Sequence, residues 1–163
     1  MTVKRVKTKA GENLAKALEN LDGKVGKVGW IHSSMYIDGK KYVAEVAAQN
    51  EFGNPNKHIP ARPFMRPTIS EKKQEWANIS KQGAEQILKG NYDIGQVLEL
   101  LGLKAAGDIR KKITQITSPP LSQITIDARL AKRANKSTVG NLTKPLIDTG
   151  IMMNTLTNSV EDD

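Results

Sequence analysis

The sequence predicts an α+β domain in which a small antiparallel sheet packs against two or three long helices. Two long central segments carry apolar residues at helical spacing, and two shorter segments near the chain ends are rich in β-branched residues. Cap and turn residues separate these segments. A chain of 163 residues without internal repeats fits one domain, which at this size buries roughly 70% of its unfolded surface. We therefore expect a single domain over residues 10–160, preceded by a mobile basic arm over residues 1–9.

The N-terminal third predicts a helix followed by a strand. Leucines and alanine at helical spacing indicate a helix over residues 12–21, which Asp22-Gly23 ends. Residues 24–31 fit a strand, and Asp38-Gly39 is a tight-turn signal. Residues 42–52 fit either the return strand of a hairpin or a helix, and their alanine content favours the helix.

Two central helices are the clearest local predictions. Residues 68–71 (Thr-Ile-Ser-Glu) form a capping box that predicts a helix start, and Gly90-Asn91 predicts its end. A second helix is expected to begin at Asp93 and to stop before residues 118–120 (Ser-Pro-Pro). Glycines within it predict a close approach of another element or a bend; they are Gly95, Gly102 and Gly107.

The C-terminal part predicts a third helix, a loop and a closing strand. Ser122 is expected to cap the helix, and the polar residues 135–144 predict a flexible loop. Asp148 is expected to cap a short helix that runs to Met153, and residues 155–160 fit a strand.

A proline-rich segment over residues 54–67 stands out from the rest of the chain. Each proline fixes its own φ and biases the preceding residue towards extended backbone, so the segment predicts a stiff, extended arm. One interpretation is a docking arm that meets a neighbouring surface, since stiffness lowers the entropy lost on binding. The other is a structural elbow, with Phe64 in the core and Arg62 paired with Glu51.

The net charge of +8 raises the question of nucleic-acid binding. The basic residues are spread over several clusters, and aromatic residues make up only 4% of the chain, so no basic–aromatic ladder for stacking bases is present. Lysine and arginine near helix C-termini also complement the helix dipole. The candidates for contact with DNA, or with an acidic partner, are Lys4, Arg5, Arg110, Lys111, Arg129 and Arg133.

Catalytic motifs are nearly absent from the sequence. There is no cysteine, and the two histidines, His32 and His58, do not lie at metal-ligand spacing. Residues 148–150 match the Asp-Thr-Gly of aspartic proteases, but that chemistry needs two aspartates on an all-β scaffold. We therefore expect no enzyme, no cofactor and no metal site. No apolar run fits a signal peptide or a membrane span, which predicts synthesis in the cytoplasm.

Several motifs in a fixed order resemble those of the tail-completion and head-tail joining proteins of tailed bacteriophages. The family's Glu-Phe-Gly motif matches residues 51–53, its Ala-Arg-Pro-Phe motif matches residues 61–64, and its Leu-hydrophobic-Asp-Thr-Gly motif matches residues 146–150. Pro119-Pro120 lies between the second and third of these. The resemblance covers residues 43–160 and does not extend to the basic arm.

The resemblance implies a structural virion protein that completes the tail or neck and permits head-tail joining. Its expected partners are neighbouring copies in a ring and other neck or tail proteins, with DNA passing through the ring and no membrane or small-molecule substrate. The expected subunit contacts are Phe52, Arg62, Phe64, Met65 and Arg66, and the expected turn or cap residues are Gly53, Asp148 and Gly150. The competing hypothesis is a basic nucleic-acid-binding module.

Overall fold

The computed structural model describes residues 8–21, 23–31, 34–36, 39, 41–135 and 142–162. Six α-helices, one 3₁₀ turn and two strands follow one another in these residues, in the order α1 (Lys9–Leu21), β1 (Lys24–Gly29), α2 (Val43–Phe52), η1 (Pro55–Lys57), α3 (Met65–Lys89), α4 (Ile94–Gln115), α5 (Gln123–Asn135), α6 (Ile151–Asn154) and β2 (Thr157–Asp162). The predicted α+β class is confirmed. No helix among these residues is long and apolar enough to cross a bilayer.

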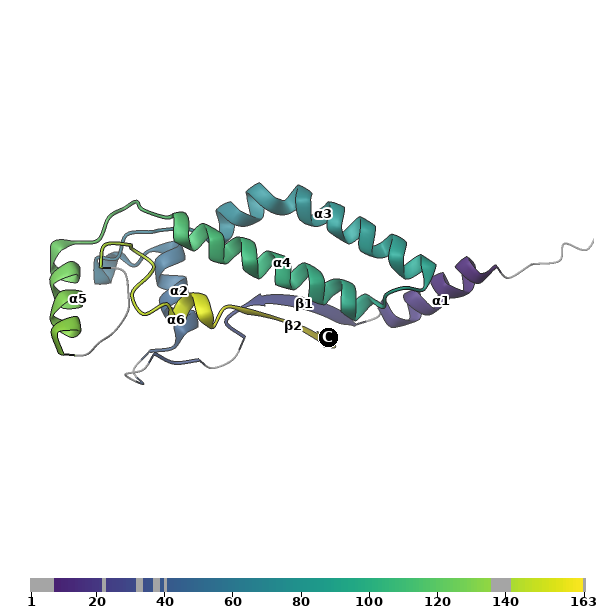
Figure 1. Cartoon of the computed structure of the whole chain (residues 1–163), viewed down its shortest axis with the longest axis horizontal. Helices are drawn as coiled ribbons and strands as arrows, with labels where there is room; N and C mark the ends of the chain where they lie inside the picture. The colour runs from purple at the N-terminus through teal and green to yellow at the C-terminus, as the bar shows by residue number, and fades with distance from the viewer. Residues whose placement is uncertain are drawn as a thin grey trace, which may run out of the picture.

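The molecule is elongated along the two longest helices (Figure 1). α3 and α4 run side by side, α1 lies at the end where they connect, and α5 lies at the opposite end (Figure 1). β1 and β2 pair antiparallel, from Lys24 opposite Asp162 to Gly29 opposite Thr157. Because α4 contacts both strands and also α3, it is the central layer between the sheet and α3.

α4 begins and faces its neighbours for reasons visible in its sequence. Asp93 accepts a hydrogen bond from the Gln96 backbone at 2.9 Å, and the Gln96 side chain accepts one from the Asp93 backbone at 3.0 Å. This capping box confirms the predicted helix start. Gly102 lets β2 approach closely, since a Cβ at this position would lie 2.8 Å from the Asn158 side chain.

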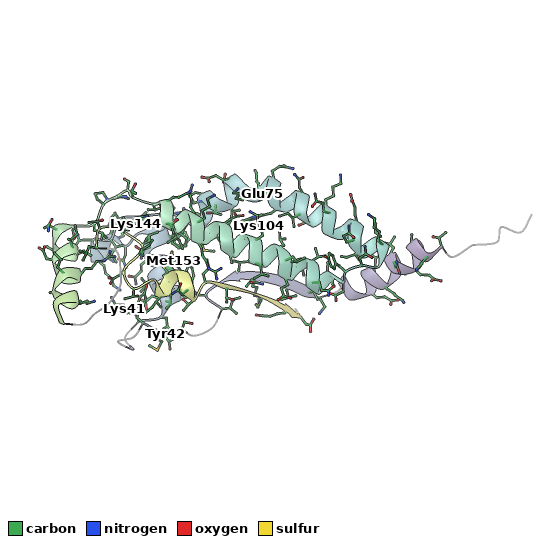
Figure 2. All side chains as sticks on the ribbon, in the orientation of Figure 1. Lys41, Tyr42, Glu75, Lys104, Lys144 and Met153 are labelled. Atoms are coloured by element: carbon green, nitrogen blue, oxygen red, sulfur yellow. The ribbon has the colours of Figure 1, made fainter. Side chains whose placement is uncertain are left out.

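Polar pairs join α3 to α4 on their solvent side. The Lys104 ammonium of α4 lies 2.7 Å from the Glu75 carboxylate of α3. Both side chains are labelled in Figure 2. Lys104 also binds Asp108 at 2.8 Å, and Asp108 accepts a hydrogen bond from the Trp76 indole at 2.9 Å. Hydrogen bonds from Lys104 and from Lys72 lower the pKa of Glu75 to about 2. These contacts connect α3 with α4 through their side chains.

The apolar core lies at the C-terminal half of α4. There α2, the start of α3 and the α6 region converge on Ile109 and Ile113, which are 2% and 1% exposed. The buried cluster consists of Val43, Ala47, Phe64, Ala106, Ile109, Ile113, Leu146, Met152 and Leu156.

Several predicted boundaries are corrected by the structure. Residues 43–52 form the helix that their alanine content favoured, whereas Tyr42 is extended and makes an isolated antiparallel bridge with Met35. Residues 54–67 are not one extended arm. They contain η1, an isolated bridge between Asn54 and Ile59, and the first turn of α3. α3 begins at Met65 and not at Thr68, whose hydroxyl donates to the Phe64 carbonyl at 2.6 Å instead of capping the helix.

Other predictions are confirmed in part or concern residues outside those that the structure describes. Ser122 accepts a hydrogen bond from the Thr125 backbone at 3.4 Å just before α5, as its predicted cap role requires. The final strand was expected over residues 155–160 but is shifted by two residues, to Thr157–Asp162, and Thr155 is instead the C-cap of α6. Most of the basic arm (residues 1–7), Asp38 of the predicted turn, and residues 136–141 of the predicted flexible loop lie outside the described residues.

Candidate functional site

The Glu51 carboxylate holds the last turn of α2 against the first turn of α3. One carboxylate oxygen accepts hydrogen bonds from the backbone N–H groups of Phe64 at 2.6 Å and Met65 at 2.9 Å. The other accepts from the backbone and the guanidinium of Arg66, at 3.1 and 2.9 Å. These donors are free at a helix N-terminus, so Glu51 acts as the cap of α3. Sequence reasoning missed this role because the cap lies far from the helix start along the chain.

The environment of Glu51 favours its charged form. The residue is only 4% exposed. Burial alone raises the pKa of a carboxyl group, but the hydrogen bonds from Met65, Phe64 and Arg66 outweigh it and hold the pKa of Glu51 below its ordinary value. Glu51 is therefore a buried carboxylate whose charged form is favoured by the hydrogen bonds it accepts.

Arg62 is buried, and its side chain joins two segments that are far apart in sequence. Its guanidinium donates to the carbonyl oxygens of Pro119 at 2.7 Å and Pro120 at 2.8 Å. Its backbone N–H donates to the Asn50 carbonyl at 2.7 Å. The elbow interpretation predicted a pair with Glu51, but Arg66 takes that place and Arg62 binds the proline turn before α5.

Phe64 confirms the other half of the elbow interpretation. It is fully buried, and its ring meets the Trp30 ring edge to face at a centroid distance of 5.9 Å. Trp30 in turn donates to the Met152 carbonyl at 2.9 Å. The proposed contact strip is thus corrected for Arg62 and Phe64, because neither side chain reaches the surface of the chain.

The remaining members of the strip form an exposed aromatic–cation pair, here called the Phe52–Arg66 surface. Phe52 is 66% exposed, and the Arg66 guanidinium lies 4.8 Å from its ring centroid. Arg66 also donates to the Glu51 carbonyl at 2.9 Å, which fixes its position. Met65 is half-buried beside them and packs against the core.

Gly53 makes the turn that separates this surface from the segment after it. Its φ is 77°, and a Cβ would lie 2.9 Å from the Ala61 backbone nitrogen. A side chain at this position would therefore strain the backbone and clash with it. The predicted turn role of Gly53 is confirmed.

Arg129 of α5 binds the segment over residues 142–148. It is 9% exposed, and its guanidinium donates to the carbonyls of Lys144 at 2.8 Å and Ile147 at 3.1 Å. It also lies 3.6 Å from Asp148. The prediction that Asp148 caps α6 is wrong. Gly150, with φ 78°, is the N-cap and turns the chain into the helix.

The basic residues considered as DNA contacts differ in their surroundings: two bind the chain's own carbonyl groups, and one is exposed. Arg110 donates to the Met153 carbonyl at 3.1 Å and to the Leu156 carbonyl, so Arg110 and Arg129 hold the C-terminal segment in place. Lys111 is exposed on α4. Lys4, Arg5 and the Arg133 side chain lie outside the described part of the chain.

A cleft of about 630 Å³ lies between α2, α5 and the segment before α6. Lys41 and Lys132 contribute cations to its lining, and Tyr36, Arg129 and Asp148 line it as well. Burial, and then the Asp148 charge, raise the pKa of the Tyr36 hydroxyl. Within the described ranges, no three histidine, aspartate or glutamate side chains are grouped as metal ligands.

No family model matches this chain, and no curated protein or solved structure is significantly similar to it. A function must therefore be inferred from the chain's own residues and from their arrangement.

Proposed function

We propose that this protein is a structural subunit of a tailed bacteriophage or prophage virion, which completes the tail or neck and permits heads to join tails. The proposal combines the order of the sequence motifs with what their residues do in the fold. It assigns the protein to the virion after synthesis in the bacterial host, with neighbouring copies and other neck or tail proteins as partners.

The observation that carries the proposal is the convergence of the motifs on one end of the molecule. Glu51 of the first motif caps the helix that follows Arg62 and Phe64 of the second. Arg62 binds the Pro119-Pro120 turn, and Arg129 binds the segment that contains the third motif. The motifs are thus parts of one hydrogen-bonded frame, as expected of residues that preserve a shape for assembly.

The same frame leaves a defined surface for a neighbour. Phe52 and Arg66 are exposed, and the Arg66 guanidinium is held by an ion pair with the buried Glu51 carboxylate. Exposed aromatic residues and arginines are enriched at the centres of protein interfaces. We assign the contact with a neighbouring virion protein to the Phe52–Arg66 surface, in place of the longer strip that included Arg62 and Phe64.

The nucleic-acid alternative loses support from two of its candidate residues. Arg110 and Arg129 use their guanidinium groups on carbonyl oxygens of the chain itself. Binding of duplex DNA by the purified protein should then depend only weakly on salt, whereas a module with several phosphate contacts shows a steep loss of affinity with salt concentration.

Fractionation of the parent phage tests the assignment to the virion. Complete virions, free tails and tailless heads are separated on a gradient, and each fraction is analysed by quantitative mass spectrometry. The proposal predicts the chain at a fixed copy number in complete virions, with none in tailless heads. Its absence from washed, complete virions would contradict the proposal.

A further inference from the structure

The two-stranded sheet ends at both of its edges without a further strand in the described part of the chain. β1 and β2 pair over six residues each, and α4 lies against both of them. In an antiparallel pair, every second residue of each strand directs its N–H and C=O groups away from the partner strand. Such edges are templates for pairing with another chain, and an isolated two-stranded sheet is marginal in stability.

The two strands carry opposite charge. β1 (Lys-Val-Gly-Lys-Val-Gly) contains two lysines and no acid, whereas β2 (Thr-Asn-Ser-Val-Glu-Asp) ends in two acids and contains no base. Within the chain, Lys24 lies 2.9 Å from Asp162 and Lys27 lies 2.6 Å from Glu161. These side chains remain between 35% and 85% exposed, so they are accessible from outside the sheet.

This charge pattern distinguishes between the ways in which two copies could pair. A joint between two β1 strands gathers lysines, and a joint between two β2 strands gathers carboxylates; like charges across a strand pair are destabilising. A joint between β2 of one copy and β1 of the next places acids beside lysines. Because β1 and β2 are antiparallel, repeating this joint keeps every copy in the same orientation, which is a head-to-tail arrangement.

We propose that the sheet continues from one copy of the chain to the next, with the β2 edge of each copy paired antiparallel to the β1 edge of its neighbour. Main-chain hydrogen bonds provide the attraction, and the alternating charges determine which edges meet. The inference rests on the proposed function for its setting in a ring, while the pairing itself is a property of the purified protein.

Carbodiimide crosslinking of isotope-mixed protein tests the pairing. This reagent joins an amine to a carboxylate in direct contact, and equal amounts of ¹⁴N and ¹⁵N protein distinguish links between chains from links within one chain. We expect crosslinked peptides that join Lys24 or Lys27 of one isotope to Glu161 or Asp162 of the other. If concentrated protein gives only same-isotope links between β1 and β2, the proposal is wrong.

An exposed ion pair elsewhere provides the matched control. Lys57 and Glu45 lie 3.9 Å apart, with side chains 53% and 51% exposed, on η1 and α2. Their crosslinks should carry a single isotope. Mixed-isotope links at this pair, as abundant as those at the sheet, would mean random collision and would overturn the inference.

A charge-exchanged variant distinguishes the head-to-tail joint from a two-fold one. The variant combines Lys24→Asp, Lys27→Glu, Glu161→Lys and Asp162→Lys, so the pairs inside the chain are kept with their signs reversed. We expect it to link with itself and to link with the wild-type chain at least ten-fold less. Preferential links between variant and wild type, with β1 joined to β1, would show a two-fold joint and contradict the proposal.

Failure of this inference and failure of the proposed function give different results. Mixed-isotope links together with virions that lack the chain would leave the strand pairing intact and remove the phage assignment. Single-isotope links together with a chain present at fixed copy number in virions would do the reverse.

Discussion

Glu51 joins the C-terminal end of α2 to the N-terminal end of α3, because it accepts hydrogen bonds from three successive backbone N–H groups. Glu51→Gln should destabilise the fold by about 1–3 kcal/mol at pH 7, since an amide presents an NH₂ group to these donors and removes the charge. Urea denaturation at pH 7 measures the loss. Glu45→Gln, an exposed change on the same helix, is the control. Equal midpoints for the two variants would contradict the cap role.

The stabilisation by Glu51 should also depend on pH. Its pKa in the folded state is lowered, so its contribution is fully present above the ordinary glutamate pKa of about 4.3 and is lost as the pH falls through the lower folded value. The stability difference between wild type and Glu51→Gln should therefore be constant from pH 7 to pH 5 and should shrink below pH 4.3. A difference that stays constant down to pH 2 would show that the charge has no part in it.

Arg62 should behave as an internal clamp and not as a surface residue. Arg62→Met keeps much of the length of the side chain but leaves the Pro119 and Pro120 carbonyls without their donors. We expect a loss of about 1–3 kcal/mol in the free energy of unfolding. Lys111→Met, at an exposed position of α4, should change it by less than about 0.5 kcal/mol. A similarly small effect at Arg62 would restore the docking interpretation for this residue.

The site was the part least accessible to sequence reasoning, because its bonds join distant residues. Thr68 had the local pattern of a cap, yet α3 begins at Met65 with Phe64 as its N-cap residue, and the carboxylate that accepts from its first N–H groups comes from Glu51 of α2. The hydrogen bonds from Arg62 to two proline carbonyls have no local sequence pattern that predicts them either. Phe64 in the core was one of two open alternatives, and only packing could decide between them.

At the scale of elements, the glycines of α4 offer a matched pair of tests. A Cβ at Gly102 would lie 2.8 Å from the Asn158 side chain, whereas a Cβ at Gly107 would have no neighbour within 4 Å. Gly107→Ala should stabilise the protein by about 1 kcal/mol through helix propensity. Gly102→Ala should give less than this gain or a net loss, because β2 must move. Thermal unfolding measures both, and equal gains would contradict the close packing of α4 on the sheet.

Helices and strands were predictable where their signals are local. The stop at Gly90 gives the end of α3, and the capping box at Asp93 and the Ser122 cap give the starts of α4 and α5. The end of β2 was not predictable in this way. Its acidic residues are poor strand formers and join the sheet opposite Lys24 and Val25 of β1, with an ion pair between Lys24 and Asp162.

At the scale of the whole molecule, the Phe52–Arg66 surface should matter for assembly and little for folding. Phe52→Ala removes a ring that is 66% exposed, so we expect a stability loss below about 1 kcal/mol. Phe64→Ala, in the core, should cost about 3–5 kcal/mol. In a phage whose own copy is inactivated, Phe52→Ala should lower the plaque titre by at least ten-fold although the protein is folded. A wild-type titre would show that the Phe52 ring is not needed for assembly and would contradict the contact assigned to this surface.

The central claim is that this chain lets filled heads join tails. Electron microscopy of particles from a parent phage or prophage whose gene carries an early stop codon tests it most directly, with a strain complemented by the intact gene as control. The account predicts filled heads beside detached or malformed tails, and intact virions after complementation. Normal infectious virions without the protein would contradict it.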